Sequence, residues 1–248
     1  MRDTVTVNGI ILSAMPVGEA DRRLSLLTKE LGKISCFARG ARKPTSRFVG
    51  DCRPFTFGSF ELMPGRDAYA LSGDNVTERF GGVTEDLVKA AYGSCFLELS
   101  GRISHENTDG GPALSLLYYA LKAIERGVMD PKLVKTVFEA KTLQFEGYLP
   151  SFTHCAKCRK ELTEAAFYPA LMSPVCRECA GESPSYPLSK SALFTMNFIA
   201  GTESRKLFSF TLKEDVLKEV KEVVDLLLSN MLGKPLKSAE LLDVLSSV

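Results

Sequence analysis

Two closely spaced pairs of cysteines constrain the fold of this 248-residue chain more than any other feature. Each pair has the pattern Cys-x-x-Cys, and seventeen residues separate the two pairs, which are Cys155, Cys158, Cys176 and Cys179. Such short turns can present four thiolates to one tetrahedral Zn²⁺, with each sulfur about 2.3 Å from the metal. Because four sulfurs leave no position open for water or a substrate, the pattern predicts one structural zinc ion per chain.

The alternatives for these residues are four ordinary thiols or two disulfides, and His154 could replace one cysteine as a ligand. Zinc is the favoured interpretation, because paired Cys-x-x-Cys turns at this separation seldom occur by accident. Between the pairs, Lys160–Leu162 and Phe167–Pro169 are expected to be short strands of a ribbon. We place the metal-binding insertion at residues 152–182.

Composition is typical of a globular protein of the cytoplasm. Hydrophobic residues make up 45% of the sequence and charged residues 25%, which are ordinary values. No apolar run approaches the roughly 18 residues of a membrane span, and the N-terminus lacks an apolar stretch of the signal-peptide type, so no membrane contact is expected. Seven cysteines, an odd number, fit a reducing compartment, and Cys36, Cys52 and Cys95 are expected to be buried.

The first 80 residues show the period of β-strands. Short runs rich in Val, Ile, Leu, Phe and Thr are separated by glycine, proline and charge clusters, without a helical pattern between them. Five strands of this kind predict a small antiparallel barrel. They are expected at Val5–Met15, Arg22–Thr28, Lys33–Arg39, Cys52–Met63 and Ala68–Asn75.

The third of these strands has one face suited to nucleic acid. Ile34, Cys36 and Ala38 would point into a core, whereas Phe37 and Arg39 would point outward. An aromatic ring followed by a guanidinium can stack a base and hold a phosphate. A half-exposed strand with Phe37 packed beneath a loop is an equal alternative.

A basic loop, Arg39–Arg47, follows this strand and holds four cations and no acid. Its glycine, proline and hydroxyl residues predict a mobile surface loop, and Asp51 is the one acid nearby. A charge run usually marks only a solvated surface, but a run of one sign on a small barrel favours phosphate binding. The predicted DNA contacts are Arg39, Arg42, Lys43 and Arg47, supported by Lys33, Phe37 and Arg53.

Beyond Gly81 and Gly82 the apolar period changes from two residues to about 3.6, which predicts a domain boundary. The expected domains are an all-β domain at residues 1–81 and an all-α domain at residues 82–248 that carries the zinc-ribbon-like insertion. Capping patterns predict helices that begin after Thr84, near Pro112, and after Asp130, Ser189 and Thr211, with a last one at Ser238–Leu245.

Residues suited to catalysis are scarce. The chain has two histidines, His105 and His154, and it lacks the glycine-rich phosphate loops and the Gly-x-Ser-x-Gly turn of common enzyme families. A zinc-ribbon hydrolase or nuclease is therefore the weakest alternative, and a protein without enzyme activity is predicted.

Several motifs taken together resemble the bacterial RecO family of recombination mediators. They are Gly9–Leu12, Gly18–Asp21, Arg39–Lys43 and the two Cys-x-x-Cys pairs, and the resemblance covers essentially the whole chain. It implies an OB-fold in the N-terminal domain, a helical zinc-bearing C-terminal domain, and binding of single- and double-stranded DNA. It also implies annealing of complementary strands and help in loading RecA on DNA coated by the single-strand-binding protein, in gap and break repair.

The resemblance further implies direct contact with RecR and with the C-terminal tail of the single-strand-binding protein, an indirect role for RecA, and a place at the bacterial nucleoid. Family members often have glycine directly after the second cysteine and a Gly-Gly pair before the third, whereas this chain has Arg159 and Ala170–Pro174. The turns of the ribbon are therefore expected to differ in shape. The rival function is a protein-interaction adaptor with a structural zinc site and no DNA binding.

Overall fold

The computed structural model describes residues 4–182 and 184–246, so predictions that touch residues 1–3, 183 or 247–248 lie outside the described residues. The chain forms two compact units. One consists of Met1–Arg126 together with Leu236–Val248, and the other is Gly127–Pro235. The last helix therefore belongs with the N-terminal unit. The predicted domain limits at residue 81 stay a prediction, since these units divide the chain elsewhere.

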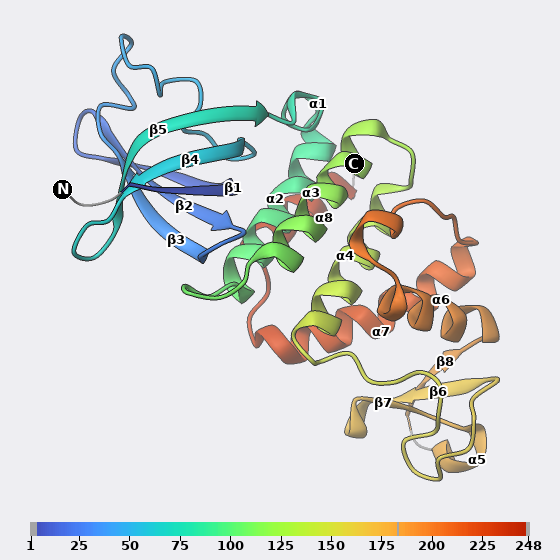
Figure 1. Cartoon of the computed structure of the whole chain (residues 1–248). Helices are drawn as coiled ribbons and strands as arrows, with labels where there is room; N and C mark the ends of the chain where they lie inside the picture. The colour runs from blue at the N-terminus through green and yellow to red at the C-terminus, as the bar shows by residue number, and fades with distance from the viewer. Residues whose placement is uncertain (1–3, 183, 247–248) are drawn as a thin grey trace. The chain divides into compact units, whose positions relative to one another are not determined.

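The first unit begins with a closed barrel of the strand order β1-β2-β3-β5-β4. β1 pairs antiparallel with both β2 and β4, and a parallel pairing of β3 with β5 closes the barrel. The predicted five-stranded barrel is confirmed, but the expectation that it is antiparallel throughout is wrong for the pairing of β3 with β5. Its form is compatible with an OB-fold. The strands are β1 (Val5–Val17), β2 (Asp21–Thr28), β3 (Gly32–Ala38), β4 (Phe57–Met63) and β5 (Tyr69–Glu78) (Figure 1).

The barrel is filled by the inward-facing residues of its strands, as the period of two requires. The predicted fourth strand starts too early, because Cys52 is a core residue of the preceding loop and Phe55 has a φ of 70°, which interrupts an extended chain. The core residues supplied by the strands are Val7, Ile11, Leu24, Leu26, Ile34, Cys36, Ala38, Phe60, Leu62 and Leu71.

Helices of the same unit follow the barrel strands, and the two long ones, α2 (Leu87–Ile103) and α3 (Gly111–Arg126), contact the barrel. The cap of α2 is Asp86 and not Thr84: the Asp86 carboxylate accepts hydrogen bonds from the backbone of Val88 and Lys89. The segment between α2 and α3 joins the β2–β3 turn, where Asn107 N donates to Leu31 O at 3.0 Å. These helices are α1 (Gly81–Thr84), α2 (Leu87–Ile103), α3 (Gly111–Arg126) and α8 (Lys237–Ser246).

The second unit is mainly helical but contains a three-stranded sheet of order β7-β6-β8, so the expectation of an all-α domain with only a ribbon insertion needs correction. Lys160–Leu162 is not a strand, although Glu161 forms an isolated bridge with His154. The sheet consists of β6 (Ala165–Tyr168), β7 (Ser173–Val175) and β8 (Tyr186–Leu188). The helices are α4 (Pro131–Phe145), α5 (Arg177–Ala180), α6 (Lys190–Gly201) and α7 (Glu214–Leu232), with short 3₁₀ turns at Pro169–Leu171 and Ser204–Lys206.

Two of the predicted caps in this unit are confirmed. Asp130 accepts from Lys132 N at 2.7 Å and Ser189 from Ala192 N at 3.2 Å. The cap predicted at Thr211 is wrong, because α7 begins at Glu214 after Lys213, without a side-chain cap. No helix in the described ranges is both long and apolar enough to cross a membrane.

Candidate nucleic-acid interface and metal centre

The predicted basic loop is the first half of the connection between β3 and β4, residues 39–56, which we call the β3–β4 loop. It is a series of hydrogen-bonded turns and not a free chain: Lys43 N donates to Gly40 O, and Ser46 N donates to Lys43 O, both at 2.9 Å. Ala41, Phe48 and Cys52 are buried in the barrel core. The expected mobile loop is therefore anchored by apolar side chains, and it holds its cations in a defined arrangement.

The start of this loop is also tied to the turn between β1 and β2. Gly40 N donates to Asp21 Oδ1 at 2.7 Å. Arg42 donates from its backbone to Ala20 O and from Nη1 to Gly18 O, both at 2.9 Å. Because carbonyl oxygens carry no net charge, these contacts orient Arg42 without neutralising it.

The cations of the loop are exposed and keep their charge. Arg39, Arg42, Lys43, Arg47 and Arg53 are all exposed, and within residues 4–182 and 184–246 no salt bridge joins any of them to a carboxylate. Asp51, the nearby acid, pairs instead with Arg79, at 2.5 Å. The loop thus presents a local excess of positive charge, although the whole chain has a formal net charge of only +1.

Beside the loop, the outer faces of β1, β2 and β3 form two transverse rows. In the register of the sheet, Arg23 pairs with Met15 on one side and with Phe37 on the other. The next row is entirely hydroxyl: Ser25 pairs with Ser13 and with Ser35. These rows alternate with buried Leu24 and Cys36, which confirms the predicted alternation of β3.

A hollow of about 390 Å³ lies over this face, and we call it the strand groove. Its lining combines the cations Arg23 and Lys33, the carboxylate of Glu106, four serine hydroxyl groups and apolar side chains, of which Met15 is 65% exposed. The segment after α2 forms its far end. The lining residues are Ser13, Met15, Arg23, Leu24, Ser25, Lys33, Ile34, Ser35, Ser104, His105 and Glu106. Oligonucleotides bind OB-folds on the corresponding strands.

Two of the predicted contact residues, Lys33 and Phe37, are also part of the packing of the barrel unit. Lys33 donates from Nζ to Gly101 O at 2.5 Å, at the C-terminal end of α2, where the helix dipole favours a cation. Phe37 is half-buried in its row. Lys33 thus fixes the helix against the barrel, and its role as a DNA contact stays a prediction.

Sequence reasoning missed Arg23, Met15 and the serine row. Alternation alone would have put Arg23 and Ser25 on the outer face of the predicted strand. Which residues of the neighbouring strands lie beside them, such as Met15 and Phe37 beside Arg23, depends on the pairing register of the strands, which the sequence does not reveal.

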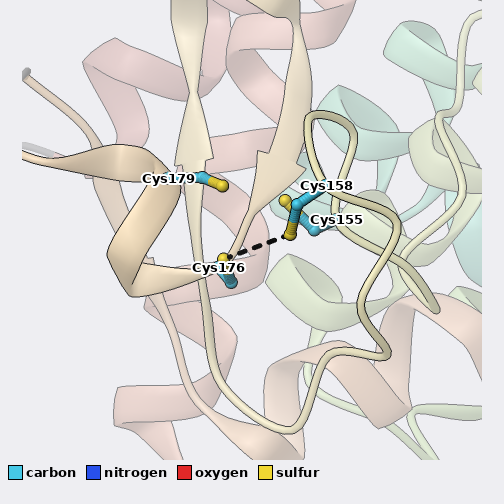
Figure 2. Close-up of side chains that lie close together, drawn as sticks. All are labelled: Cys155, Cys158, Cys176 and Cys179. Atoms are coloured by element: carbon cyan, nitrogen blue, oxygen red, sulfur yellow. Dashed lines mark hydrogen bonds between the residues drawn. The ribbon is translucent and has the colours of Figure 1, made fainter.

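The four cysteines converge as predicted. Their sulfur atoms all lie within 4.8 Å of one another, and Figure 2 shows them turned toward a common centre. The Sγ atoms of Cys158 and Cys176 are 3.7 Å apart. Sulfurs held 2.3 Å from one tetrahedral metal lie about 3.8 Å apart, whereas a disulfide requires about 2.05 Å. The geometry fits four metal ligands and excludes the disulfide alternative for this pair.

The local backbone prepares Cys155 for a metal. Although burial raises it, the pKa of this thiol falls to about 6, because the backbone N–H groups of Cys158, Cys176 and Lys157 donate to the sulfur. A lower pKa favours the thiolate, which is the form that binds metal. His154 is not part of the cluster, and its Nδ1 lies 2.9 Å from Thr153 Oγ1.

The turn after the second cysteine uses a backbone conformation that glycine favours. Arg159 has a φ of 65°, in the left-handed region, and Met172, ahead of the third cysteine, has a φ of 47°. The expectation that these turns differ in shape from those of other family members stays a prediction, and Arg159 itself adopts the strained conformation.

Comparison with known proteins gives the same family that the motifs suggest. The family models described as the N-terminal and C-terminal parts of recombination protein O match residues 1–80 and 84–240. The chain is 30% identical to the DNA repair protein RecO of Symbiobacterium thermophilum, over 97% of both chains.

Two further relatives carry the same name. The RecO of Bacillus subtilis is 29% identical, over 97% of this chain and 94% of its own. That of Acetivibrio thermocellus is 28% identical, over 87% of each. These names describe a DNA repair protein and state no enzyme activity. The chain therefore belongs to the RecO family of DNA repair proteins.

Proposed function

We propose that this protein is a DNA-binding recombination mediator that anneals complementary strands and assists the loading of RecA onto single-stranded DNA coated by the single-strand-binding protein, in gap and break repair. One observation carries the proposal: Arg39, Arg42, Lys43 and Arg53 of the β3–β4 loop are exposed, form no salt bridge within the described chain and lie beside the strand groove. A local cluster of this kind is the electrostatic footprint of phosphate binding.

The loop and the groove would play different parts. Arg39, Arg42 and Lys43 would neutralise phosphates, which lowers the repulsion between two strands and so promotes pairing. In the groove, Met15 offers an apolar surface for an unpaired base, and Phe37, in the same transverse row but outside the groove lining, offers an aromatic one. Serine hydroxyls can donate or accept hydrogen bonds, so the serine row favours no particular base, as a mediator of repair on any sequence requires.

The experiment is a titration of labelled oligonucleotide by fluorescence anisotropy at several salt concentrations. Arg39, Arg42 and Lys43, each releasing one counterion from single-stranded DNA, give a slope of log affinity against log salt of about −2, from roughly 0.7 per contact, and a fully engaged Arg47 brings the slope to about −3. Replacing all four by alanine should flatten the slope. An unchanged slope would remove the loop from the binding site.

A matched control separates this local effect from the loss of net charge. Four exposed cations of the other unit, replaced by alanine together, should leave the slope as it is in the unchanged protein. They are Lys190, Arg205, Lys206 and Lys213. The rival function, a protein-interaction adaptor, predicts no DNA binding at micromolar protein in any variant.

We assign the contacts with RecR, with the tail of the single-strand-binding protein and, indirectly, with RecA to the helical part of the chain. An exposed aromatic patch in the second unit supports a protein contact there. Phe194 is 71% exposed and stacks on Phe198 at 6.4 Å, and Phe198 meets Phe210 at 5.3 Å. Such apolar surface is typical of protein interfaces. A cytoplasmic place at the nucleoid follows from the same proposal.

We also propose that the four cysteines hold one structural zinc ion. The donor set supports zinc, because four thiolates prefer this metal and complete its coordination. The metal would join the turn at Cys155 and Cys158 to the turn that leads into α5 at Cys176 and Cys179. Its contribution is to the stability of residues 152–182 and not to a reaction.

A further inference from the structure

Two arginine contacts fasten the β3–β4 loop to β5. Arg79, directly after β5, places Nη2 and Nε at 2.5 and 3.2 Å from Oδ1 of Asp51. Arg47 reaches back from the loop and donates through Nη2 to the carbonyl oxygen of Ser72. The guanidinium of Arg47 also lies 4.6 Å from the centre of the Phe48 ring. Of the four predicted phosphate contacts, Arg47 is thus the one held against the barrel wall.

Asp74 brings a second carboxylate to this place, two residues after Ser72 on β5. Its Oδ2 is buried and has no hydrogen-bond partner within the described chain. Burial raises the pKa of Asp74, and so does the charge of Asp51, whereas Arg47 and Arg79 lower it. A buried carboxylate oxygen without a donor attracts a cation strongly. Arg47 retains N–H groups that can meet this demand, since a guanidinium has five.

Two thiols of the barrel core stay protonated near neutral pH. Burial, followed by the charge of Asp74, raises the pKa of Cys52 to about 12, and burial likewise raises that of Cys36 to about 12. Arg22 donates to the carbonyl oxygen of Cys52. On β4, the carboxylate of Glu61 lies against Gly73. Asp51 and Asp74 are therefore balanced by Arg47 and Arg79, and we call these four residues the clasp.

We propose that Asp74 competes with DNA phosphates for Arg47, so that the clasp sets how tightly the β3–β4 loop binds DNA. This inference rests on the proposed DNA binding by the same loop. Without DNA, Arg47 donates to the carbonyl oxygen of Ser72, two residues before Asp74, and its charge acts on the Asp74 carboxylate. When a phosphate takes Arg47, Asp74 loses one of its two compensating cations and favours its protonated form. DNA binding is then linked to uptake of a proton, and affinity increases as the pH falls from 7 toward the raised pKa of Asp74.

The first test is Asp74→Asn, which keeps the shape of the side chain and removes its charge. Arg47 is then free to add one phosphate contact. One further counterion released from single-stranded DNA steepens the salt slope by about 0.7, which corresponds to a roughly fivefold gain in affinity at 0.1 M salt. Unchanged or weaker binding by Asp74→Asn would overturn the inference, because a purely structural aspartate gives no gain.

A double-mutant cycle with Arg47→Ala locates the effect. In the unchanged protein Arg47→Ala should weaken binding only slightly, whereas in the Asp74→Asn background it should remove the whole gain. The pH profile gives a second readout: affinity should rise in acid for the unchanged protein and stay level for Asp74→Asn. A gain in DNA affinity that Asp74→Asn still produces in the Arg47→Ala background would contradict the proposed competition for Arg47.

The matched control is Asp67→Asn, which removes the same charge from an exposed residue in the β4–β5 loop of the same barrel. A gain as large as that of Asp74→Asn would show an effect of net charge and overturn the inference. Circular dichroism and thermal unfolding confirm that each variant is folded. If the unchanged protein binds no DNA, the proposed function fails with the inference; if it binds and only the Asp74 effects are missing, the clasp alone fails.

Discussion

Glu98 in α2 accepts hydrogen bonds from Ser238, 140 residues further along the chain, through both its backbone N–H at 2.8 Å and its hydroxyl at 2.7 Å. Lys237 N donates to the same carboxylate at 3.1 Å, and Arg102 pairs with it at 2.7 Å. Glu98 therefore serves as the acidic cap of α8, supplied by another helix. This contact joins the end of the chain to the unit that contains the barrel.

Glu98→Gln should loosen α8 and lower stability by about 1–2 kcal/mol, because hydrogen bonds to a charged acceptor are the stronger kind. Burial raises the pKa of Glu98, but hydrogen bonds from Ser238, Lys237 and Arg102 outweigh this and lower it below its ordinary value of 4.5. The stabilisation is then complete above about pH 4.5 and is lost as the pH falls through the lower folded pKa.

Thermal unfolding between pH 7 and pH 3 measures this dependence. The difference between the unchanged protein and Glu98→Gln should shrink in acid. Glu182→Gln, at an exposed acid of the other unit, is the control and should have little effect at any pH. A constant difference across the range would show that the charge of Glu98 does not hold α8.

Gly93 gives a test of how closely α2 packs against Phe55 and Val83. A Cβ there would lie 2.8 Å from Phe55 Cε1 and 3.0 Å from Val83 Cγ1. Gly93→Ala should lower the free energy of unfolding by about 1–2 kcal/mol, since overpacking exceeds the gain of about 1 kcal/mol in helix propensity.

Gly101→Ala in the same helix is the matched control, because its Cβ would meet only Leu12 Cδ1, at an ordinary 3.5 Å. This variant should be neutral or stabilised by up to about 1 kcal/mol. Urea unfolding of both variants gives the comparison. Equal effects of the two substitutions would contradict close packing at Phe55.

The features that the sequence predicts well are those that depend on neighbours in the chain. Alternation gave the inner and outer faces of β3, and Asp130 and Ser189 were recognised as caps because a cap bonds to a backbone N–H two or three residues away. The Cys-x-x-Cys pairs also work locally, since each turn brings two sulfurs to one side.

Features that need distant partners were missed or misjudged. The pairing of Asp51 with Arg79 depends on the path of the loop across β5. The transverse row through Arg23 depends on strand register. The loop was expected to be mobile because its glycine and proline are local signals, whereas burial of Phe48 and Cys52 is a tertiary one.

Arg159 carries backbone strain that glycine would relieve. A non-glycine residue in the left-handed region costs roughly 1–2 kcal/mol, and glycine loses more backbone entropy on folding, roughly 0.5–1 kcal/mol. Arg159→Gly, at a φ of 65°, should therefore stabilise the segment that carries the four cysteines by about 0.5–1 kcal/mol. Ala156→Gly in the neighbouring turn is the control and should destabilise it. Limited proteolysis within residues 152–182 reports on both, and faster cleavage of Arg159→Gly would contradict the assignment of strain.

Removal of the metal should loosen the segment that the cysteines join. Structural zinc contributes apparent energies of about 10–16 kcal/mol in small peptides, as much as the whole stability of many domains. A chelator should make residues near 150–180 sensitive to protease, and metal analysis of the protein as purified should give one zinc per chain. Cys176→Ser should lose the metal, whereas Cys95→Ala, at a buried cysteine of α2, should keep it. Unchanged protease sensitivity after chelation would refute a structural metal.

The strand groove predicts a difference between single strands and duplexes. Ser25 pairs with Ser13 and Ser35 in the middle of the groove, so Ser25→Leu should fill the space into which an unpaired base would enter. A duplex keeps its bases inside and meets the protein mainly through its phosphates, which the loop contacts. Affinity for single-stranded DNA should fall about tenfold, the loss of roughly one stacked base, while affinity for duplex DNA stays the same.

Ser59→Leu, on β4 outside the groove lining, is the control and should change neither affinity. Anisotropy titrations with matched oligonucleotides measure both, and an equal loss for the two forms of DNA would place the unpaired bases elsewhere.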